Sequence, residues 1–165
     1  MKRDNHYEAA FEGFLRDRQV PYVAVDEAKR TLADGGSIKN LDFIVSAASR
    51  RFLVDVKGRL FPGGERRQYW KNWSTRDDLR GLARWQELFG DGFEGLFVFA
   101  YLVVGDRSPL PREQLFTFRG KPYGFVGVRL GEYVEAARLI SPKWDTVAMS
   151  AKGFRALARP LVELL

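Results

Sequence analysis

The sequence contains no cysteine and a single histidine, His6, among its 165 residues. Without cysteine there is no disulfide framework and no zinc site built on thiolates, and a lone histidine lacks the partners of a histidine-based zinc site. No apolar run approaches about 18 residues, so no transmembrane helix is expected. The first residues carry charges throughout and lack the apolar core of a signal peptide, which predicts a cytoplasmic location and no membrane association.

The composition is that of a folded protein with a surplus of positive charge. Hydrophobic residues make up 45% and aromatic residues 14% of the chain, which is typical of a globular protein with a sizeable core. We expect a single domain over residues 1–165. The net charge is +6. This surplus favours polyanionic partners such as nucleic acid, although many basic proteins bind none.

Apolar periodicity, caps and breakers predict an ordered series of helices and strands. The expected elements are a helix at 7–18, which Asp4 or Asn5 can cap, strands at 21–25, 38–45 and 52–56, and an irregular loop or ribbon that begins at Gly58. A helix at 76–89 follows, with a capping-box pattern of Ser74 and Thr75 with Asp77 and Asp78. The next element is a strand at 95–104 that is expected to be buried on both faces. The polar stretch 26–37 is expected to hold at most one helical turn. Strands at 114–118 and 123–130, a helix at 131–140 and a last helix after Ser150 follow. This order predicts an α/β fold, with a mixed sheet flanked by helices and a C-terminal α+β extension at about 105–165.

Two of the apolar strands carry charged residues in unusual places. Strand alternation puts Asp55 and Lys57 on one face, about 7 Å apart, and Asp42 on the preceding strand can reach the same face. Two carboxylates beside the Val56 carbonyl would suit Mg²⁺ or Mn²⁺, and a neighbouring lysine could orient a water for phosphodiester hydrolysis. The spacing alone leaves another interpretation open, an ion pair of Asp55 with Lys57 and a turn cap by Asp42.

The spacing of Asp42, twelve further residues and then Asp55-Val56-Lys57 resembles the PD-(D/E)xK nuclease superfamily, which has the restriction-endonuclease-like fold. The core of that family, helix, three strands, helix and strand, matches the order expected over about residues 6–104. Leu41 stands where the proline of the motif would be. The resemblance is to an uncharacterised bacterial branch.

The resemblance implies a function and a set of roles. The chain would be an Mg²⁺- or Mn²⁺-dependent endo- or exonuclease acting on nucleic acid, with DNA the expected substrate, and it could form a homodimer. The implied metal ligands are the carboxylates of Asp42, Asp55 and Glu8 and the carbonyl of Val56. Lys57 would position the attacking water. Glu12 competes with Glu8 for the place on the first helix. The alternative is a catalytically inactive nucleic-acid-binding or assembly module of the same fold.

Other residues have a plain structural interpretation beside the functional one. The cations Arg59, Arg66, Arg67 and Lys71 lie in or beside a basic aromatic segment that could contact phosphates, and its tryptophans, Trp70 and Trp73, could stack on bases or fill the core. Three further residues are candidates for places around the metal site: His6, Asp26 and Gln86. His6 could equally be a helix-start residue, and Asp26 could lie in a solvated turn.

Overall fold

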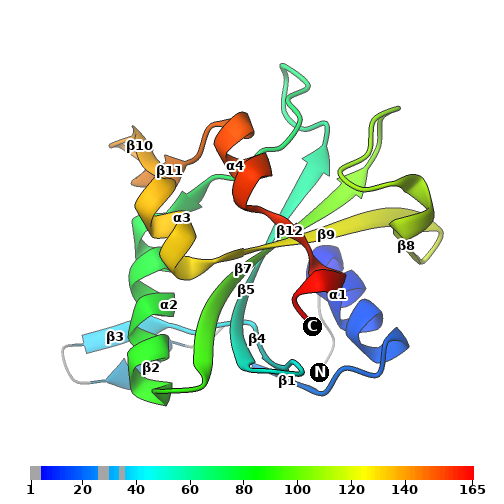
Figure 1. Ribbon diagram of the computed structural model, residues 1–165. Coiled ribbons are helices and arrows are strands. Elements are labelled where there is room, and N and C mark those ends of the chain that lie inside the picture. The colour runs from blue at the N-terminus through cyan, green and yellow to red at the C-terminus, as the bar shows by residue number, and fades with distance from the viewer. Residues whose placement is uncertain (1–4, 26–29, 34–35) are drawn as a thin grey trace.

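The computed structural model describes residues 5–25, 30–33 and 36–165, which fold around one mixed sheet (Figure 1). Within this part of the chain the sheet has seven strands, in the order β1-β4-β5-β7-β9-β12 with β8 paired to β9. Its strands are β1 (Tyr22–Ala24), β4 (Phe43–Ser46), β5 (Arg51–Phe61), β7 (Phe93–Val103), β8 (Phe116–Phe118), β9 (Lys121–Arg129) and β12 (Arg159–Pro160). Strands β5 and β7 are parallel and the other pairs are antiparallel.

Two helices cover opposite faces of this sheet (Figure 1). Helix α1 (His6–Asp17) begins at Asn5, whose side chain accepts a hydrogen bond from the backbone N–H of Tyr7 at 2.9 Å. Helix α2 (Arg76–Phe89) begins at Thr75 and ends at Gly90. Both were predicted from side-chain periodicity and capping residues, and both predictions are confirmed.

The sheet therefore separates two apolar cores. Phe11 of α1 packs with Val54 and Val98 on one face, and Leu82 of α2 packs with Phe97 on the other. Strand β7 contributes to both cores, as its continuous apolar run predicts. Burial of each large apolar side chain contributes about 1.5–3 kcal/mol, so the central strands hold both helices in place.

The segment between β1 and β4 differs from the prediction. The single strand expected at 38–45 is wrong, because β3 (Gly36–Lys39) pairs with β2 (Arg30–Ala33) in a separate hairpin and β4 starts only at Phe43. The helical turn expected within 26–37 is wrong for Arg30–Ala33. Antiparallel pairing between these two short segments outweighs the weak helical preference of a short polar stretch.

Strand β5 is longer than predicted, because it pairs with β7 along its whole length, from Arg51 opposite Phe93 to Phe61 opposite Val103. Gly58, expected in a loop, lies inside this strand. A Cβ atom at Gly58 would lie 2.0 Å from the ring of Tyr7. The missing side chain thus lets the start of α1 lie directly against β5.

The C-terminal part adds to the same sheet and builds a smaller one. Helix α3 (Leu130–Ala136) is shorter than predicted, since the second half of the expected helix forms strand β10 (Arg138–Ser141). The small sheet runs β10-β11-β6, with β11 at Thr146–Ala148 and β6 at Ser74–Thr75. Helix α4 (Ala151–Leu157) begins at Ser150 as predicted, and short 3₁₀ helices span Arg112–Gln114 and Leu161–Glu163. No helix in the described part of the chain is long and apolar enough to cross a membrane.

Candidate functional site

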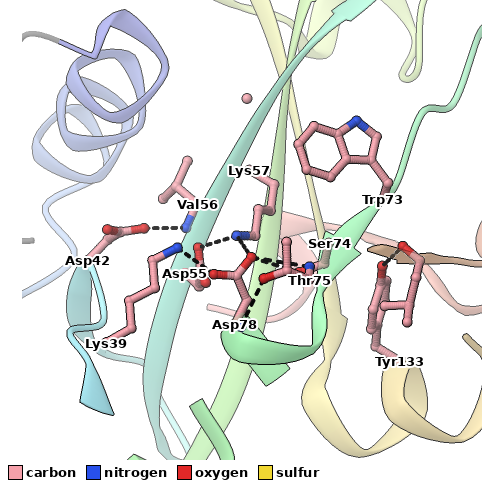
Figure 2. A network of polar contacts seen from close by, with 12 residues as sticks. Lys39, Asp42, Asp55, Val56, Lys57, Trp73, Ser74, Thr75, Asp78 and Tyr133 are labelled. Atoms are coloured by element: carbon pink, nitrogen blue, oxygen red, sulfur yellow. Dashed lines mark hydrogen bonds and ion pairs between the residues drawn. The ribbon is translucent and has the colours of Figure 1, made fainter. Parts of the chain in front are cut away.

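A lysine held between two carboxylates forms the centre of the candidate site (Figure 2). Lys57 Nζ lies 3.3 Å from Asp55 Oδ1 and 2.6 Å from Asp78 Oδ2. The Lys57 side chain is only 11% exposed. Asp55 and Lys57 come from alternate positions of β5 and face α2, whereas Asp78 comes from α2 itself. Charges this far from water need such partners, so the pairing fixes the lysine in place.

Asp78 organises the start of α2 as well as the site. Its backbone N–H donates to Thr75 Oγ1 at 3.1 Å, and its Oδ2 accepts from the backbone N–H of Thr75 at 3.3 Å. The hydroxyl of Ser74 donates to the same Oδ2 at 3.2 Å. The capping box predicted from the sequence is thus confirmed. Its spacing gave no sign that the capping carboxylate would also bind Lys57, so sequence reasoning missed Asp78 as a site residue.

Lys39, at the end of β3, was also missed. Its ammonium forms an ion pair with Asp78 Oδ1. The Lys39 carbonyl accepts a hydrogen bond from Trp85 Nε1 at 3.0 Å, and Gly81 allows this backbone to approach α2 closely. Lys39 reaches the site because the β2–β3 hairpin packs on α2, a contact that neither segment's own pattern could indicate.

Asp42 is anchored to the edge of β5. Its backbone N–H donates to the Val54 carbonyl at 2.9 Å, and its carboxylate accepts from the Val56 N–H at 2.7 Å. The ladder between β4 and β5 ends with Phe43 opposite Val54. The backbone N–H and C=O of one strand residue point to the same edge, so the Val56 carbonyl also faces the Asp42 side. Asp42 is 5% exposed.

The pKa values of the two carboxylates around Lys57, those of Asp55 and Asp78, are shifted in opposite directions. Burial raises the pKa of Asp55 and the nearby Asp78 carboxylate adds to this effect, which Lys57 and Lys39 oppose. Burial acts on Asp78 in the same direction, but the charges and hydrogen bonds of the two lysines outweigh it and hold the pKa below its usual range. Asp78 is therefore the firmly ionised member of the pair.

Glu8 lies at a different depth from its competitor Glu12. Glu8 is 1% exposed, whereas Glu12 forms an ion pair with Arg16 at 2.9 Å. Both belong to α1, on the face of the sheet opposite to Asp55 and Lys57. In residues 5–25, 30–33 and 36–165, no three histidine or acidic side chains gather as a ready-made metal site. The three-acid arrangement expected from the resemblance is thus not preformed.

The basic aromatic segment divides its residues between the core and the surface. Trp70 packs against Phe61 at 5.1 Å between ring centroids and so fills the core. Trp73 is 39% exposed, and the Arg59 guanidinium lies 3.9 Å from its ring centroid while donating to its carbonyl at 2.5 Å. The exposed cations of the loop after β5 are Arg66 and Arg67, and Lys71 is half-buried.

Of the remaining candidates, none of those described contacts Lys57. His6 begins α1, with Nδ1 3.0 Å from Tyr123 Oη. Gln86 accepts a hydrogen bond from the Gly95 N–H at 2.7 Å and lies eight residues beyond Asp78, about 12 Å along the helix. Asp26 lies outside the described residues.

Comparison with known proteins finds a similarity in fold. No protein-family model matches the sequence, and no curated protein is similar to it in sequence. Among solved structures, the chain resembles a Holliday junction resolvase from the archaeal hyperthermophile Archaeoglobus fulgidus, with a TM-score of 0.58 and 9% sequence identity. The likeness covers 96% of this chain and 97% of that one. It confirms the restriction-endonuclease-like α/β fold predicted from the sequence.

Proposed function

We propose that this chain is a metal-dependent nuclease that hydrolyses phosphodiester bonds in nucleic acid, with DNA as the expected substrate. The observation that carries the proposal is Lys57, an ammonium held between Asp55 and Asp78 on the strand whose edge binds the Asp42 carboxylate. The nuclease-like fold supports it, since a solved structure with a similar fold is a resolvase.

The donor groups at this place fit a hard divalent cation. Asp42 and Asp55 supply carboxylate oxygens, and the Val56 carbonyl faces the same edge, a set suited to Mg²⁺ or Mn²⁺. The Lys39 ammonium forms an ion pair with Asp78 beside these donors. In this proposal Asp42 and Asp55 hold the ion, and Glu8, which α1 carries on the opposite face of the sheet, is not one of the ligands. The ion would neutralise negative charge developing on the phosphate.

The chain's own residues would position the substrate and the water. Lys57 donates a hydrogen bond to the attacking water, and its two carboxylate partners keep the ammonium in one orientation. Arg66, Arg67 and Lys71 would contact phosphates of the nucleic-acid backbone. Arg59 would act next to them, because it follows Lys57 on the same face of β5 and lies over Trp73.

Metal binding should be visible as stabilisation. Adding Mg²⁺ or Mn²⁺ at about 100 times its dissociation constant is expected to stabilise the wild-type protein by about 2.7 kcal/mol. Asp55→Asn should lose this effect, because it removes a ligand charge. Thermal melts with and without the ion measure it, and Asp77→Asn, an exposed acid in the same turn as Asp78, serves as the control. Equal shifts in wild type and Asp55→Asn would contradict the assigned ligands.

Substrate binding should depend on the loop rather than on the metal site. Replacing Arg66, Arg67 and Lys71 together by alanine is expected to weaken DNA binding and to reduce the salt slope by about three units, nearly one for each lost phosphate contact. Turnover at saturating substrate should remain. Binding titrations at several salt concentrations measure both quantities. The matched control removes three exposed cations elsewhere, Arg18, Arg119 and Lys143. Equal losses in both triple variants would mean that no particular surface binds DNA.

A further inference from the structure

Lys39 lies where a cation is needed. Its ammonium pairs with Asp78, and in Figure 2 it points into the space between Asp42 and Asp55. Burial acts to lower the pKa of Lys39, but the hydrogen bond to Asp78 and the charges of Asp78, Asp55 and Asp42 outweigh it and raise the pKa. A cavity of about 10 Å³, lined among others by Lys39, Asp55 and Asp78, adjoins this ammonium. That volume is close to the smallest that holds one water molecule, so the ammonium leaves little free space among the acids.

The charges at this place disfavour the simultaneous presence of the Lys39 ammonium and a divalent metal ion. Among the described residues labelled in Figure 2, the carboxylates of Asp42, Asp55 and Asp78 lie around the ammonium groups of Lys39 and Lys57. These five groups together carry one negative charge, so a divalent ion that replaced Lys39 would make their sum neutral. The same ion added beside Lys39 would leave excess positive charge in a largely buried region, which is costly.

Of the two lysine side chains, that of Lys39 is the one that a metal ion can displace. The Lys39 side chain is 46% exposed, whereas that of Lys57 is 11% exposed and contacts two carboxylates. The backbone of Lys39 stays attached to α2 through Trp85. Its long side chain can therefore swing into water by changing rotamers, with no movement of the strand.

We propose that the Lys39 ammonium, held by Asp78, lies in the position that Mg²⁺ or Mn²⁺ takes beside Asp42 and Asp55 and must be displaced before the ion binds. Lys39 thereby sets the metal affinity of the site and keeps the acids paired until the ion arrives. The inference rests on the proposed function, because it takes Asp42 and Asp55 as the metal ligands.

Calorimetric titration of the full chain with Mn²⁺ tests the inference. Lys39→Met is expected to bind Mn²⁺ about tenfold or more tightly than wild type, because the competing charge is gone. Lys39→Arg keeps the charge and should stay near the wild-type affinity. Arg80→Met is the control, because it removes an exposed cation of α2 that pairs with Asp145. It should change the Mn²⁺ affinity less than about twofold, since solvent screens the Arg80 charge. Asp55→Asn should bind no Mn²⁺.

A second measurement uses the wild-type protein alone. Mg²⁺ should increase the acylation rate of the Lys39 amine by an amine-reactive reagent, followed by peptide mass spectrometry, because the displaced side chain enters water.

The outcomes separate this inference from the function on which it rests. Equal Mn²⁺ affinities in wild type and Lys39→Met, with binding lost only in Asp55→Asn, would overturn the role of Lys39 and leave the metal site intact. An unchanged acylation rate under saturating Mg²⁺ would overturn it as well. Failure of every variant to bind Mn²⁺ would overturn both the metal-dependent function and the inference.

Discussion

Replacing Lys57 by alanine is expected to slow phosphodiester hydrolysis by about 10²-fold or more, the scale of a positioned proton-transfer group. The reason is geometric, since Lys57 is the ammonium that Asp55 and Asp78 hold at fixed distances beside the proposed metal ligands. DNA affinity should change little, because one cation among many contributes about one unit to the salt slope. Single-turnover cleavage and equilibrium binding, measured on the same preparations, separate the two effects.

The substrates for this comparison are single-stranded, double-stranded and branched DNA and RNA, each with Mg²⁺ or Mn²⁺. Lys57→Gln is the companion variant, because its amide can keep hydrogen bonds to the two carboxylates without the charge. Full cleavage by both variants would show that the activity belongs to another site or another protein. Binding without cleavage by the wild type, on every substrate, would favour the alternative of an inactive binding module.

The sequence predicts best where a pattern is local. The apolar run of β7 predicted a strand buried on both faces, because no alternation marks a solvent side. Candidate capping residues, Asp4 or Asn5 and Ser74 or Thr75, predicted the starts of both helices, because a cap acts within one turn. The observed caps are Asn5 and Thr75. Asp55 and Lys57 share a face through strand alternation, and that part of the candidate site follows directly from the sequence.

The sequence predicts least where distant segments meet. Lys39 and Asp78 are 39 residues apart and become partners only because the β2–β3 hairpin packs on α2. The polar composition of residues 26–37 does not predict that Arg30–Ala33 will pair with Gly36–Lys39. The same limit applies to Glu8, whose position on the first helix was clear but whose face of the sheet depends on the packing of α1.

The length of β5 shows a related limit. The strand was predicted to end at Val56, and Gly58 was expected to open an irregular loop or ribbon. Glycine in the interior of a strand weakens it. In the structure the parallel pairing with β7 outweighs that preference, and the missing Cβ gives the ring of Tyr7 its place. A residue that disfavours a strand locally is therefore required there by tertiary packing.

Asp78→Asn is expected to destabilise the protein by about 3 kcal/mol at pH 7, the lower part of the range for removing one partner of a buried ion pair. The carboxylate is 3% exposed and accepts hydrogen bonds from both Lys57 and Lys39. Its loss leaves Lys57 with Asp55 as its remaining ion-pair partner in the described part of the chain. Asp77→Asn, on the exposed side of the same turn, should change the free energy of unfolding by about 1 kcal/mol or less, the scale of an exposed charge near a helix N-terminus.

The pH dependence of this difference tests its cause. The folded-state pKa of Asp78 lies below that of an unfolded aspartate, so its contribution is complete above about pH 4 and is lost as the pH falls through the folded pKa. The Asp78 carboxylate contributes to the raised pKa of Asp55, so the Asp55 contribution does not cancel between wild type and Asp78→Asn. Urea unfolding from pH 7 to pH 2 is therefore compared in an Asp55→Asn background, where the proteins with and without Asp78→Asn should converge in stability at the acid end. A difference that stays constant down to pH 2 would assign the loss to the altered helix cap instead of the ion pairs.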